Sequence, residues 1–330
     1  MRIFVSIQGG ELRDSFVDRR AEERLAALGA QFWEGSAHIS PGELGERLKS
    51  TDVLMTCWGC PEITESMLDG SPLKLIVHTG GSVGSLVAPG VYAKGVRVAS
   101  GNAYFAESVA EGVLGYMLFA LRKMGAASNA LHEGRWIEPV ALRTEGLLDQ
   151  TVGIVSLGAI SRRLIEMGRV FRLRFKVFSQ HPDQELAKAL GFEYAGLEEI
   201  FSECKIVSLH TAARPETRHM IGAKLFALMR PDAIFINTAR GSVVDEAALA
   251  KCLSEKRFRA VLDVYEKEPL SPGHPLIGLE NAELFPHCGG PTYDRRSWIT
   301  NRMLDNLDAF IKGEPMENEV DFGAYSRMTL

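Results

Sequence analysis

The 330-residue sequence lacks a cysteine pattern that would define its class. Its five cysteines are scattered and odd in number, so they predict no disulfide framework. Cys57 and Cys60 form a C-x-x-C, but no second pair of ligands at similar spacing supports a zinc site. We therefore expect no bound metal. The pair is interpreted either as a redox dithiol or, preferably, as two small residues packed at a loop.

Long apolar runs and an excess of one charge are also missing. The longest apolar stretch, near Val113–Leu121, is too short to span a bilayer, and Met1–Asp14 turns polar too early for a signal peptide. The net charge is −5 with both signs interspersed, which gives no indication of a nucleic-acid partner. These absences predict a cytoplasmic protein that binds neither nucleic acid nor a membrane.

Short apolar segments alternate with amphipathic helical patterns through most of the chain. This alternation predicts an α/β fold of two Rossmann-like, doubly wound parallel sheets, with helices on both faces of each sheet and a cleft between two domains. The strands are expected at Arg2–Ser6, Val53–Thr56, Leu73–Val77, Val152–Ser156, Phe175–Phe178, Ile206–Leu209, Ala233–Ile236, Ala260–Leu262 and Glu283–Phe285. The helices are expected at Glu22–Leu28, Ala110–Leu121, Arg162–Gly168, Glu246–Leu253 and Asp294–Ile311.

The order of these segments predicts a discontinuous first domain. A long helical stretch, Phe105–Leu131, follows a glycine-bearing loop, and a complete strand–helix series then begins at Thr151. We expect residues 1–102 and 296–330 to form a flavodoxin-like substrate domain. Residues 103–295 are expected to form a dinucleotide-binding Rossmann domain.

The stretch TVGIVSLGAISRRL, residues 151–164, has the form of a dinucleotide-binding turn that lacks two of its three glycines. The G-x-G-x-x-G pattern between a strand and a helix becomes Ser156-Leu157-Gly158-Ala159-Ile160-Ser161. Gly158 retains the position at which the backbone must approach the pyrophosphate. Serine at the first position is unfavourable if that residue needs a positive φ. Ser161 could donate its hydroxyl to the phosphate.

Polar residues follow three successive strands of the second domain. Ala233–Ile236 is followed by Arg240, Ala260–Leu262 by Asp263 and Glu268, and Glu283–Phe285 by His287. Ligands of doubly wound sheets bind at the carboxyl ends of the strands, so these side chains are expected to act together. Histidine can exchange a proton near neutrality, a carboxylate can orient it, and arginine can hold a carboxylate. Together with a nicotinamide, this set suits the oxidation of a 2-hydroxy acid.

At these residues the sequence resembles the D-isomer-specific 2-hydroxyacid dehydrogenases, the family that includes phosphoglycerate, glycerate and formate dehydrogenases. The resemblance extends over roughly Leu73–Asp321 and is most specific in NTARGSVVDEAAL, residues 237–249, and in FPHCGGPT, residues 285–292. It implies that His287 is the acid/base, that Glu268 is its partner, and that Arg240 binds the substrate carboxylate and keto oxygen. It further implies a homodimer formed through the long helical segment before the glycine turn.

The same resemblance implies the remaining binding residues. Asp263 would hold the nicotinamide carboxamide with help from the backbone of Thr238 and Ala239. The residues expected to bind the cofactor are Ser156, Gly158, Ala159, Ile160, His181, Thr211, Thr238, Ala239, Asp263, Gly289 and Gly290. The residues expected to bind the substrate are Trp58, His78, Gly80, Gly81 and Arg240.

The residue at the end of the second strand departs from the family pattern. His181 stands where the family has an acidic residue that binds the ribose hydroxyls and repels a 2′-phosphate. The cofactor is therefore expected to be NAD or NADP. Asp183 either takes over the acidic role or caps the next helix.

Taken together, the sequence predicts an NAD(P)-dependent oxidoreductase that interconverts a D-2-hydroxy acid and its 2-oxo acid. One alternative is a non-enzymatic NAD(P)-binding regulatory protein with the same fold. Another is an enzyme whose altered glycine turn no longer holds a dinucleotide.

Overall fold

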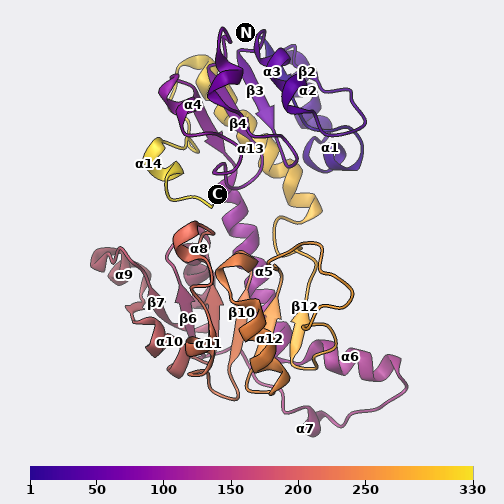
Figure 1. The fold of residues 1–330 in the computed structure, drawn as a ribbon, viewed down its shortest axis with the longest axis vertical. Coiled ribbons are helices and arrows are strands. Elements are labelled where there is room, and N and C mark those ends of the chain that lie inside the picture. The colour runs from indigo at the N-terminus through magenta and orange to yellow at the C-terminus, as the bar shows by residue number, and fades with distance from the viewer. Residues whose placement is uncertain (330) are drawn as a thin grey trace. The chain divides into compact units, whose positions relative to one another are not determined.

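The computed structural model describes residues 1–329, which divide into two compact units. The first comprises residues 1–105 and 291–329, and the second comprises residues 106–290. Each unit contains one parallel sheet with helices on both faces, as the alternation of strands and helices predicts (Figure 1). The assignment of a substrate role to one unit and a cofactor role to the other stays a prediction.

The sheet of the first unit has the strand order β2-β1-β3-β4-β5, with every neighbouring pair parallel. This is the flavodoxin-like order. Its strands are β1 (Ile3–Val5), β2 (Gln31–Phe32), β3 (Val53–Thr56), β4 (Leu75–His78) and β5 (Arg97–Ser100). Its helices are α1 (Glu11–Phe16), α2 (Arg19–Ala27), α3 (Pro41–Leu48), α4 (Gly90–Ala93), α13 (Tyr293–Lys312) and α14 (Phe322–Tyr325).

The core of the first unit has two layers, one on each side of the sheet. One layer packs α1, α2 and α13 against the sheet, and the other packs α3, α4 and α14. The C-terminal residues thereby complete a unit that begins at the N-terminus. Burial of both faces explains why β3 and β4 are continuous apolar segments rather than alternating ones.

The sheet of the second unit has the order β12-β11-β10-β9-β6-β7-β8, again entirely parallel. The direction of winding reverses between β6 and β9, which is the switch point of a Rossmann fold. Its strands are β6 (Thr151–Val155), β7 (Arg174–Phe178), β8 (Glu193–Tyr194), β9 (Ile206–Leu209), β10 (Ile234–Asn237), β11 (Arg259–Leu262) and β12 (Ala282–Leu284). The helices that cover it are α5 (Asn102–Leu121, which begins in the first unit), α6 (Met124–His132), α7 (Pro139–Leu142), α8 (Ala159–Gly168), α9 (Gln184–Leu190), α10 (Leu197–Glu203), α11 (Ala223–Phe226) and α12 (Glu246–Ser254).

Both faces of this second sheet are covered by helices. Helices α5, α8 and α9 pack against one face, and α10, α11 and α12 pack against the other. Figure 1 shows α11 and α12 in front of the strands. This arrangement leaves the carboxyl ends of the strands, with the loops that follow them, available for a ligand.

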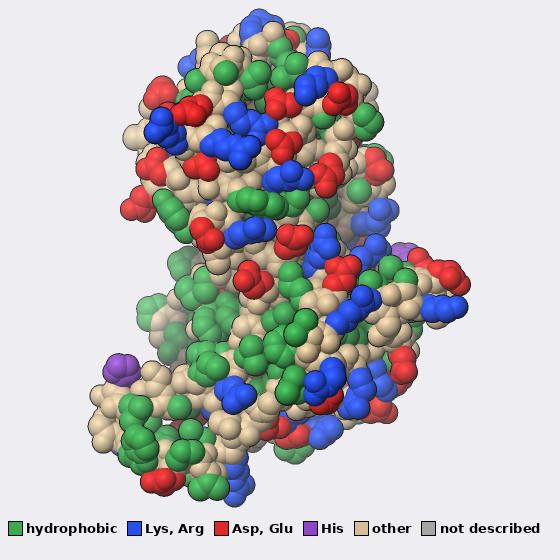
Figure 2. Space-filling model, turned by 180° about the vertical axis from the view of Figure 1, so that it is seen from behind, with side chains coloured by type: hydrophobic (Ala, Val, Ile, Leu, Met, Phe, Trp, Pro, Cys, Tyr) green, Lys and Arg blue, Asp and Glu red, His purple; other side chains and the backbone are tan. Residues whose placement is uncertain are grey.

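The long helical segment expected at Phe105–Leu131 is interrupted. Lys123 adopts a left-handed conformation with φ 51° between α5 and α6, which ends the first helix. Beyond this break, Met124, Leu131, Trp136 and Val140 expose between 47% and 86% of their surface. Figure 2 shows hydrophobic side chains gathered on the projecting segment that contains α6 and α7.

Candidate active site

Three loops after β10, β11 and β12 carry the predicted catalytic residues. Arg240 follows β10, Asp263 and Glu268 follow β11, and His287 follows β12. Because the three strands are adjacent and parallel, their carboxyl ends lie at one edge of the sheet. The structure therefore places these side chains in neighbouring loops.

His287 and Glu268 form a hydrogen-bonded pair. The Nδ1 atom of His287 lies 2.7 Å from Oε2 of Glu268, and the side chains are 47% and 36% exposed. The backbone N–H of Tyr265 donates to the other carboxylate oxygen of Glu268 at 3.0 Å. Within residues 1–329, Nε2 of His287 has no hydrogen-bond partner. A neutral ring in this geometry presents Nε2 to solvent, where it can exchange a proton with a ligand.

Asp263 is buried, with 2% of its surface exposed, and its carboxylate is bound by the protein itself. Oδ1 accepts hydrogen bonds from the Tyr116 hydroxyl at 2.9 Å and from the Cys288 amide at 2.8 Å. Oδ2 accepts from the Gly289 amide at 2.9 Å. The direct observation is thus that Asp263 holds the loop after His287. A contact with a nicotinamide carboxamide stays a prediction.

The loop after β10 brings Arg240 close to the loop after β11. A Cβ on Gly241 would lie 1.8 Å from the Tyr265 carbonyl carbon, so glycine is required at this position. Asn237 braces the turn, accepting from the Ala239 amide at 3.0 Å and donating to the Arg240 carbonyl at 3.3 Å. Desolvation lowers the pKa of Arg240, and the negative charge of Glu268 opposes that shift.

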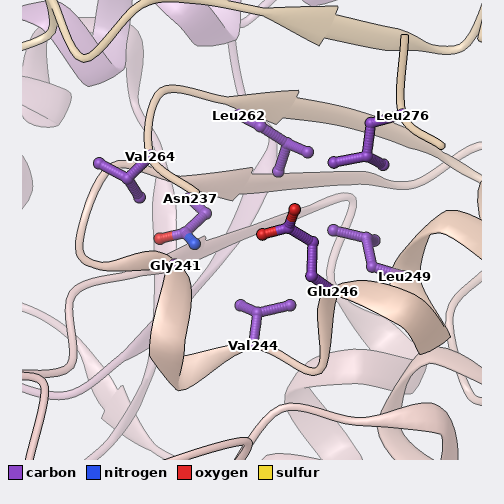
Figure 3. A pocket seen from close by; sticks show the side chains of 8 residues that line it. All are labelled: Asn237, Gly241, Val244, Glu246, Leu249, Leu262, Val264 and Leu276. Carbon is purple, nitrogen blue, oxygen red and sulfur yellow. The ribbon is translucent and has the colours of Figure 1, made fainter. Parts of the chain in front are cut away.

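A small cavity of about 10 Å³ lies behind these loops (Figure 3). The Asn237 amide and the Glu246 carboxylate are its polar groups, and valine and leucine side chains form much of the remainder. Oε2 of Glu246 accepts from the Glu266 amide at 2.7 Å, and Oε1 lies 2.6 Å from Nε2 of His274. A space of this size holds about one water molecule, so it is too small for a substrate.

The altered glycine turn is held together by the serines that replace the glycines. Ser156 has φ 78°, so the first position does require the left-handed conformation that an L-residue adopts at a cost of about 1–2 kcal/mol. Its hydroxyl lies 2.8 Å from that of Thr211, which follows β9, so this bond spans the switch point of the sheet. The Ser161 hydroxyl is buried and donates to the Ser156 carbonyl at 2.6 Å. The expectation that Ser161 donates to phosphate is therefore corrected.

The region around this turn has the features that a dinucleotide requires. Gly158 is exposed, and a Cβ there would meet nothing within 4 Å. In the described part of the chain, the amides of Ala159, Ile160 and Ser161 in the first turn of α8 have no hydrogen-bond acceptor. Free amides at a helix N-terminus favour phosphate. The buried Thr238 hydroxyl also lacks a partner there, and Gly290 has open space around its Cα. These residues fit a dinucleotide.

The loop after β7 contains His181, which is exposed. The His181 amide donates to the Ser179 hydroxyl at 3.2 Å. Asp183 Oδ1 accepts from the Leu186 amide at 3.0 Å and thus caps α9, while an acidic role toward a ribose stays a prediction. The loop therefore offers a hydroxyl and an imidazole at the strand end where the family has an acid.

The predicted substrate-binding residues lie in the first unit. Gly80 and Gly81 follow β4, and the amides of Gly80 through Val83 have no acceptor within residues 1–329. His78 is only 4% exposed, and its Nδ1 lies 2.7 Å from the Thr56 hydroxyl. Burial lowers the pKa of His78 to about 4, so the ring is neutral at physiological pH. A Cβ on Gly80 would lie 2.3 Å from Nε2 of His78, so a side chain at residue 80 would collide with the buried ring.

Trp58 is 40% exposed and lies among aromatic and cationic groups of the same unit. Its ring makes edge contacts with Phe16 and Phe105 at centroid distances of 5.0 and 6.0 Å. The Arg296 guanidinium lies 5.0 Å from the ring centroid. Both packing and ligand contact are compatible with this position, so its substrate role stays a prediction.

The C-x-x-C lacks the properties of a reactive dithiol. Cys57 is buried and Cys60 is half-buried. Burial raises the pKa of the Cys57 thiol to about 12 and that of the Cys60 thiol to about 11, so the thiolate that redox exchange needs is disfavoured. No group of three or more potential metal ligands is found in residues 1–329. Over the same residues, no helix has both the length and the apolar character needed to cross a membrane.

Two polar residues of this region were not expected from the sequence. Tyr116 belongs to an apolar helix, where a tyrosine resembles a core residue. His210 follows β9, and its Nε2 lies 2.9 Å from the Ser208 hydroxyl while its buried Nδ1 lacks a partner among the described residues. Burial lowers the pKa of His210 to about 4. The position of His210 after a strand was the one signal that could have identified it.

Comparison with known proteins assigns the chain to a family. The family model described as the NAD-binding domain of D-isomer specific 2-hydroxyacid dehydrogenases matches residues 114–289. A glyoxylate reductase of Korarchaeum cryptofilum is 30% identical over 315 residues, covering 93% of this chain and 95% of that protein. A hydroxypyruvate reductase of Thermotoga maritima is also 30% identical, covering 82% and 89%.

A solved structure agrees with this assignment. The TT0316 protein from Thermus thermophilus superposes with a TM-score of 0.81 at 27% identity, covering 97% of this chain and all of that one. The two parallel sheets, with the glycine turn after β6 and the loops after β10, β11 and β12, thus belong to a known class of fold. The chain belongs to the D-isomer specific 2-hydroxyacid dehydrogenase family and is an NAD(P)-dependent oxidoreductase.

Proposed function

We propose that this enzyme reduces a small 2-oxo acid to the D-2-hydroxy acid, and catalyses the reverse oxidation, with His287 as acid/base. The observation that carries the proposal is the 2.7 Å contact between Nδ1 of His287 and Glu268, which leaves Nε2 free. The carboxylate fixes the orientation of the ring. His287 would give its Nε2 proton to the carbonyl oxygen during reduction and take it back during oxidation.

Arg240 is proposed to bind the substrate carboxylate and to polarise the carbonyl group. Its guanidinium carries a fork of donors that matches a carboxylate, and only one bond, from Nη1 to the Ala239 carbonyl at 2.6 Å, ties it to the protein in residues 1–329. The free amides of Gly80 through Val83, in the first unit, are proposed to bind the substrate. When bound, the nicotinamide supplies or accepts the hydride.

The names of the relatives support a proposed substrate class. Glyoxylate and hydroxypyruvate reductases are similar to this chain over most of its length, so glyoxylate and hydroxypyruvate are the proposed substrates. A panel of 2-oxo acids that also includes aromatic members, measured with each cofactor, tests this assignment. Turnover of aromatic 2-oxo acids alone would contradict it.

His287→Ala and Arg240→Ala test the catalytic roles directly. Each is expected to lower kcat/KM by at least about a hundredfold while the dissociation constant of the cofactor stays within a few-fold. The control is Arg20→Ala, an exposed arginine on α2 of the first unit. Turnover near that of the unmodified enzyme in either active-site variant contradicts the proposed roles.

We further propose that NADPH binds at least as well as NADH. An acidic residue at the end of β7 would repel the 2′-phosphate, but the chain has His181 there and uses Asp183 as a helix cap. Quenching of tryptophan fluorescence gives both dissociation constants. His181→Asp should weaken NADPH binding about tenfold or more relative to NADH, and an unchanged ratio would remove the loop from the determinants of preference.

The exposed apolar surface of α6 and α7 is proposed as the homodimer interface. Exposed apolar patches of this kind mark interaction surfaces, and Trp136 and Val140 are 72% and 86% exposed. Sedimentation velocity should give a dimer for the unmodified chain and a shift toward monomer for Trp136→Glu. A monomer in both cases would exclude this role.

A further inference from the structure

One hydroxyl in the second unit contacts the catalytic loop from behind. Tyr116 lies on α5, with its ring against that of Phe285 at a centroid distance of 4.5 Å. Its hydroxyl donates to Asp263 Oδ1 at 2.9 Å and lies 3.6 Å from the Cys288 Sγ atom. Burial, followed by the Cys288 contact and the Asp263 charge, raises the pKa of Tyr116, so the hydroxyl keeps its proton and acts as a donor.

The Asp263 carboxylate transmits this contact to the residues that follow His287. It accepts from two consecutive amides, those of Cys288 and Gly289, and its 2% exposure leaves water little access. A buried carboxylate needs its donors because no solvent replaces a lost one. The Tyr116 hydroxyl is the one side-chain donor in this set within the described residues.

His287 itself is held in an unfavourable backbone conformation. Its φ is 53°, in the left-handed region that costs an L-residue about 1–2 kcal/mol. Such conformations persist when the surrounding contacts determine them. The ring is bound by Glu268 on one side, and the backbone is bound by Asp263 on the other, through the next two amides.

Helix α5 leaves little space behind this loop. A Cβ on Gly112 would lie 3.0 Å from the Gly289 carbonyl oxygen, and one on Gly289 would lie 2.8 Å from Asp263 Oδ2 and 3.1 Å from the Tyr116 ring. The two glycines let the helix and the loop approach closely enough for the hydroxyl to reach the carboxylate. Because the packing is tight, a small change at Tyr116 is expected to be felt at His287.

We propose that Tyr116 is a positioning residue for catalysis, because its hydroxyl fixes the Asp263 carboxylate. That carboxylate holds the backbone after His287 through the Cys288 and Gly289 amides. The His287 ring is thereby kept in contact with Glu268. This inference rests on the proposed role of His287. Tyr116 acts on the loop of His287 through Asp263, and its contact with the Cys288 Sγ atom reaches the same loop.

The test is Tyr116→Phe, which keeps the ring packing on Phe285 and removes only the hydroxyl. The matched control is Tyr325→Phe in the first unit, where a buried tyrosine hydroxyl donates to the Val87 carbonyl at 2.8 Å. Both variants lose one buried hydrogen bond, so both should lose similar thermal stability. Only Tyr116→Phe should affect the chemical step.

Kinetics with glyoxylate and a cofactor deuterated at the transferred position separate positioning from general damage. For Tyr116→Phe we expect kcat to fall about tenfold, with the KM for glyoxylate within about twofold and a larger deuterium isotope effect, since a displaced His287 slows the chemistry rather than binding. Loss of active molecules alone would lower kcat without changing the isotope effect. An isotope effect equal to that of the unmodified enzyme, or a kcat within twofold of it, overturns the proposal.

Amide hydrogen exchange provides a readout that does not depend on turnover. The segment containing Cys288 and Gly289 should exchange at least about tenfold faster in Tyr116→Phe and at an unchanged rate in Tyr325→Phe. Unchanged exchange in Tyr116→Phe overturns the proposal. If the unmodified enzyme reduces no 2-oxo acid with either cofactor, the proposed function fails, and the exchange result still decides whether Tyr116 holds this loop.

Discussion

Gly241→Ala should damage both stability and catalysis, because the added Cβ would meet backbone atoms. It would lie 1.8 Å from the Tyr265 carbonyl carbon and 2.2 Å from the Glu266 amide nitrogen. Ordinary carbon contacts begin near 3.5 Å, so the loops after β10 and β11 would have to separate by more than about 1 Å. Overpacking of this kind costs about 1–3 kcal/mol, which corresponds to a melting temperature lower by roughly 2–12 °C for a unit of this size.

The same displacement moves Arg240 relative to Glu268. A misplacement of about 1 Å at a positioning residue can cost about a hundredfold in rate, so kcat/KM for the 2-oxo acid should fall by that order. Differential scanning calorimetry and steady-state kinetics measure the two effects. The control is Gly273→Ala, where a Cβ meets nothing within 4 Å and the φ is not positive. A Gly241→Ala enzyme with an unchanged melting temperature and kcat/KM within twofold would refute the reasoning.

Two further predictions concern the glycine turn and a buried histidine. Ser161→Ala removes the hydrogen bond to the Ser156 carbonyl and should lower the free energy of unfolding by about 1 kcal/mol, which denaturant titration can measure. It should also weaken dinucleotide binding, which fluorescence quenching can measure. An unchanged affinity for the cofactor would contradict this prediction. Burial lowers the pKa of His78 from 6.5 to about 4, so between these pH values the unfolded chain binds a proton that the folded chain does not. The stability that neutral His78 contributes is therefore present above pH 6.5 and is lost as the pH falls toward 4. The free energy of unfolding should fall by about 2 kcal/mol at pH 5 because of His78 alone. His78→Asn should therefore show a flatter dependence of the free energy of unfolding on pH. An equal dependence in the variant and the unmodified protein would contradict the lowered pKa of His78.

The sequence predicted nine of the strands but omitted β2, β5 and β8, which lie at sheet edges. Val53–Thr56 and Ile206–Leu209 agree with β3 and β9 to the residue, because continuous apolar runs mark strands buried on both faces. The strands β2 and β8 are two residues long and lie at sheet edges, so they contain too few residues for a pattern. The break at Lys123 was not foreseen, since the residue that adopts the left-handed conformation is itself neither glycine nor asparagine.

In the candidate site too, some contacts could be predicted from the sequence and others could not. The pairing of His287 with Glu268 was implied by the family resemblance, and the two residues follow the neighbouring parallel strands β12 and β11. The binding of Asp263 by Tyr116 depends on how closely α5 approaches the loop, and sequence spacing carries no information about that approach. The positive φ of Ser156 was considered as a requirement of the turn, but the bond from its hydroxyl to Thr211 needed coordinates.

The His181 part of the loop after β7 is bonded less closely to its neighbours than the loops after β10, β11 and β12 are to one another. Those three are interlocked through Gly241, Glu268 and Asp263, so a substitution in one disturbs the others. His181 is exposed, and its amide bonds only within its own loop. On the proposed role of His181, coenzyme preference can be varied at residues 179–181, with effects that should add to those of changes in the three interlocked loops.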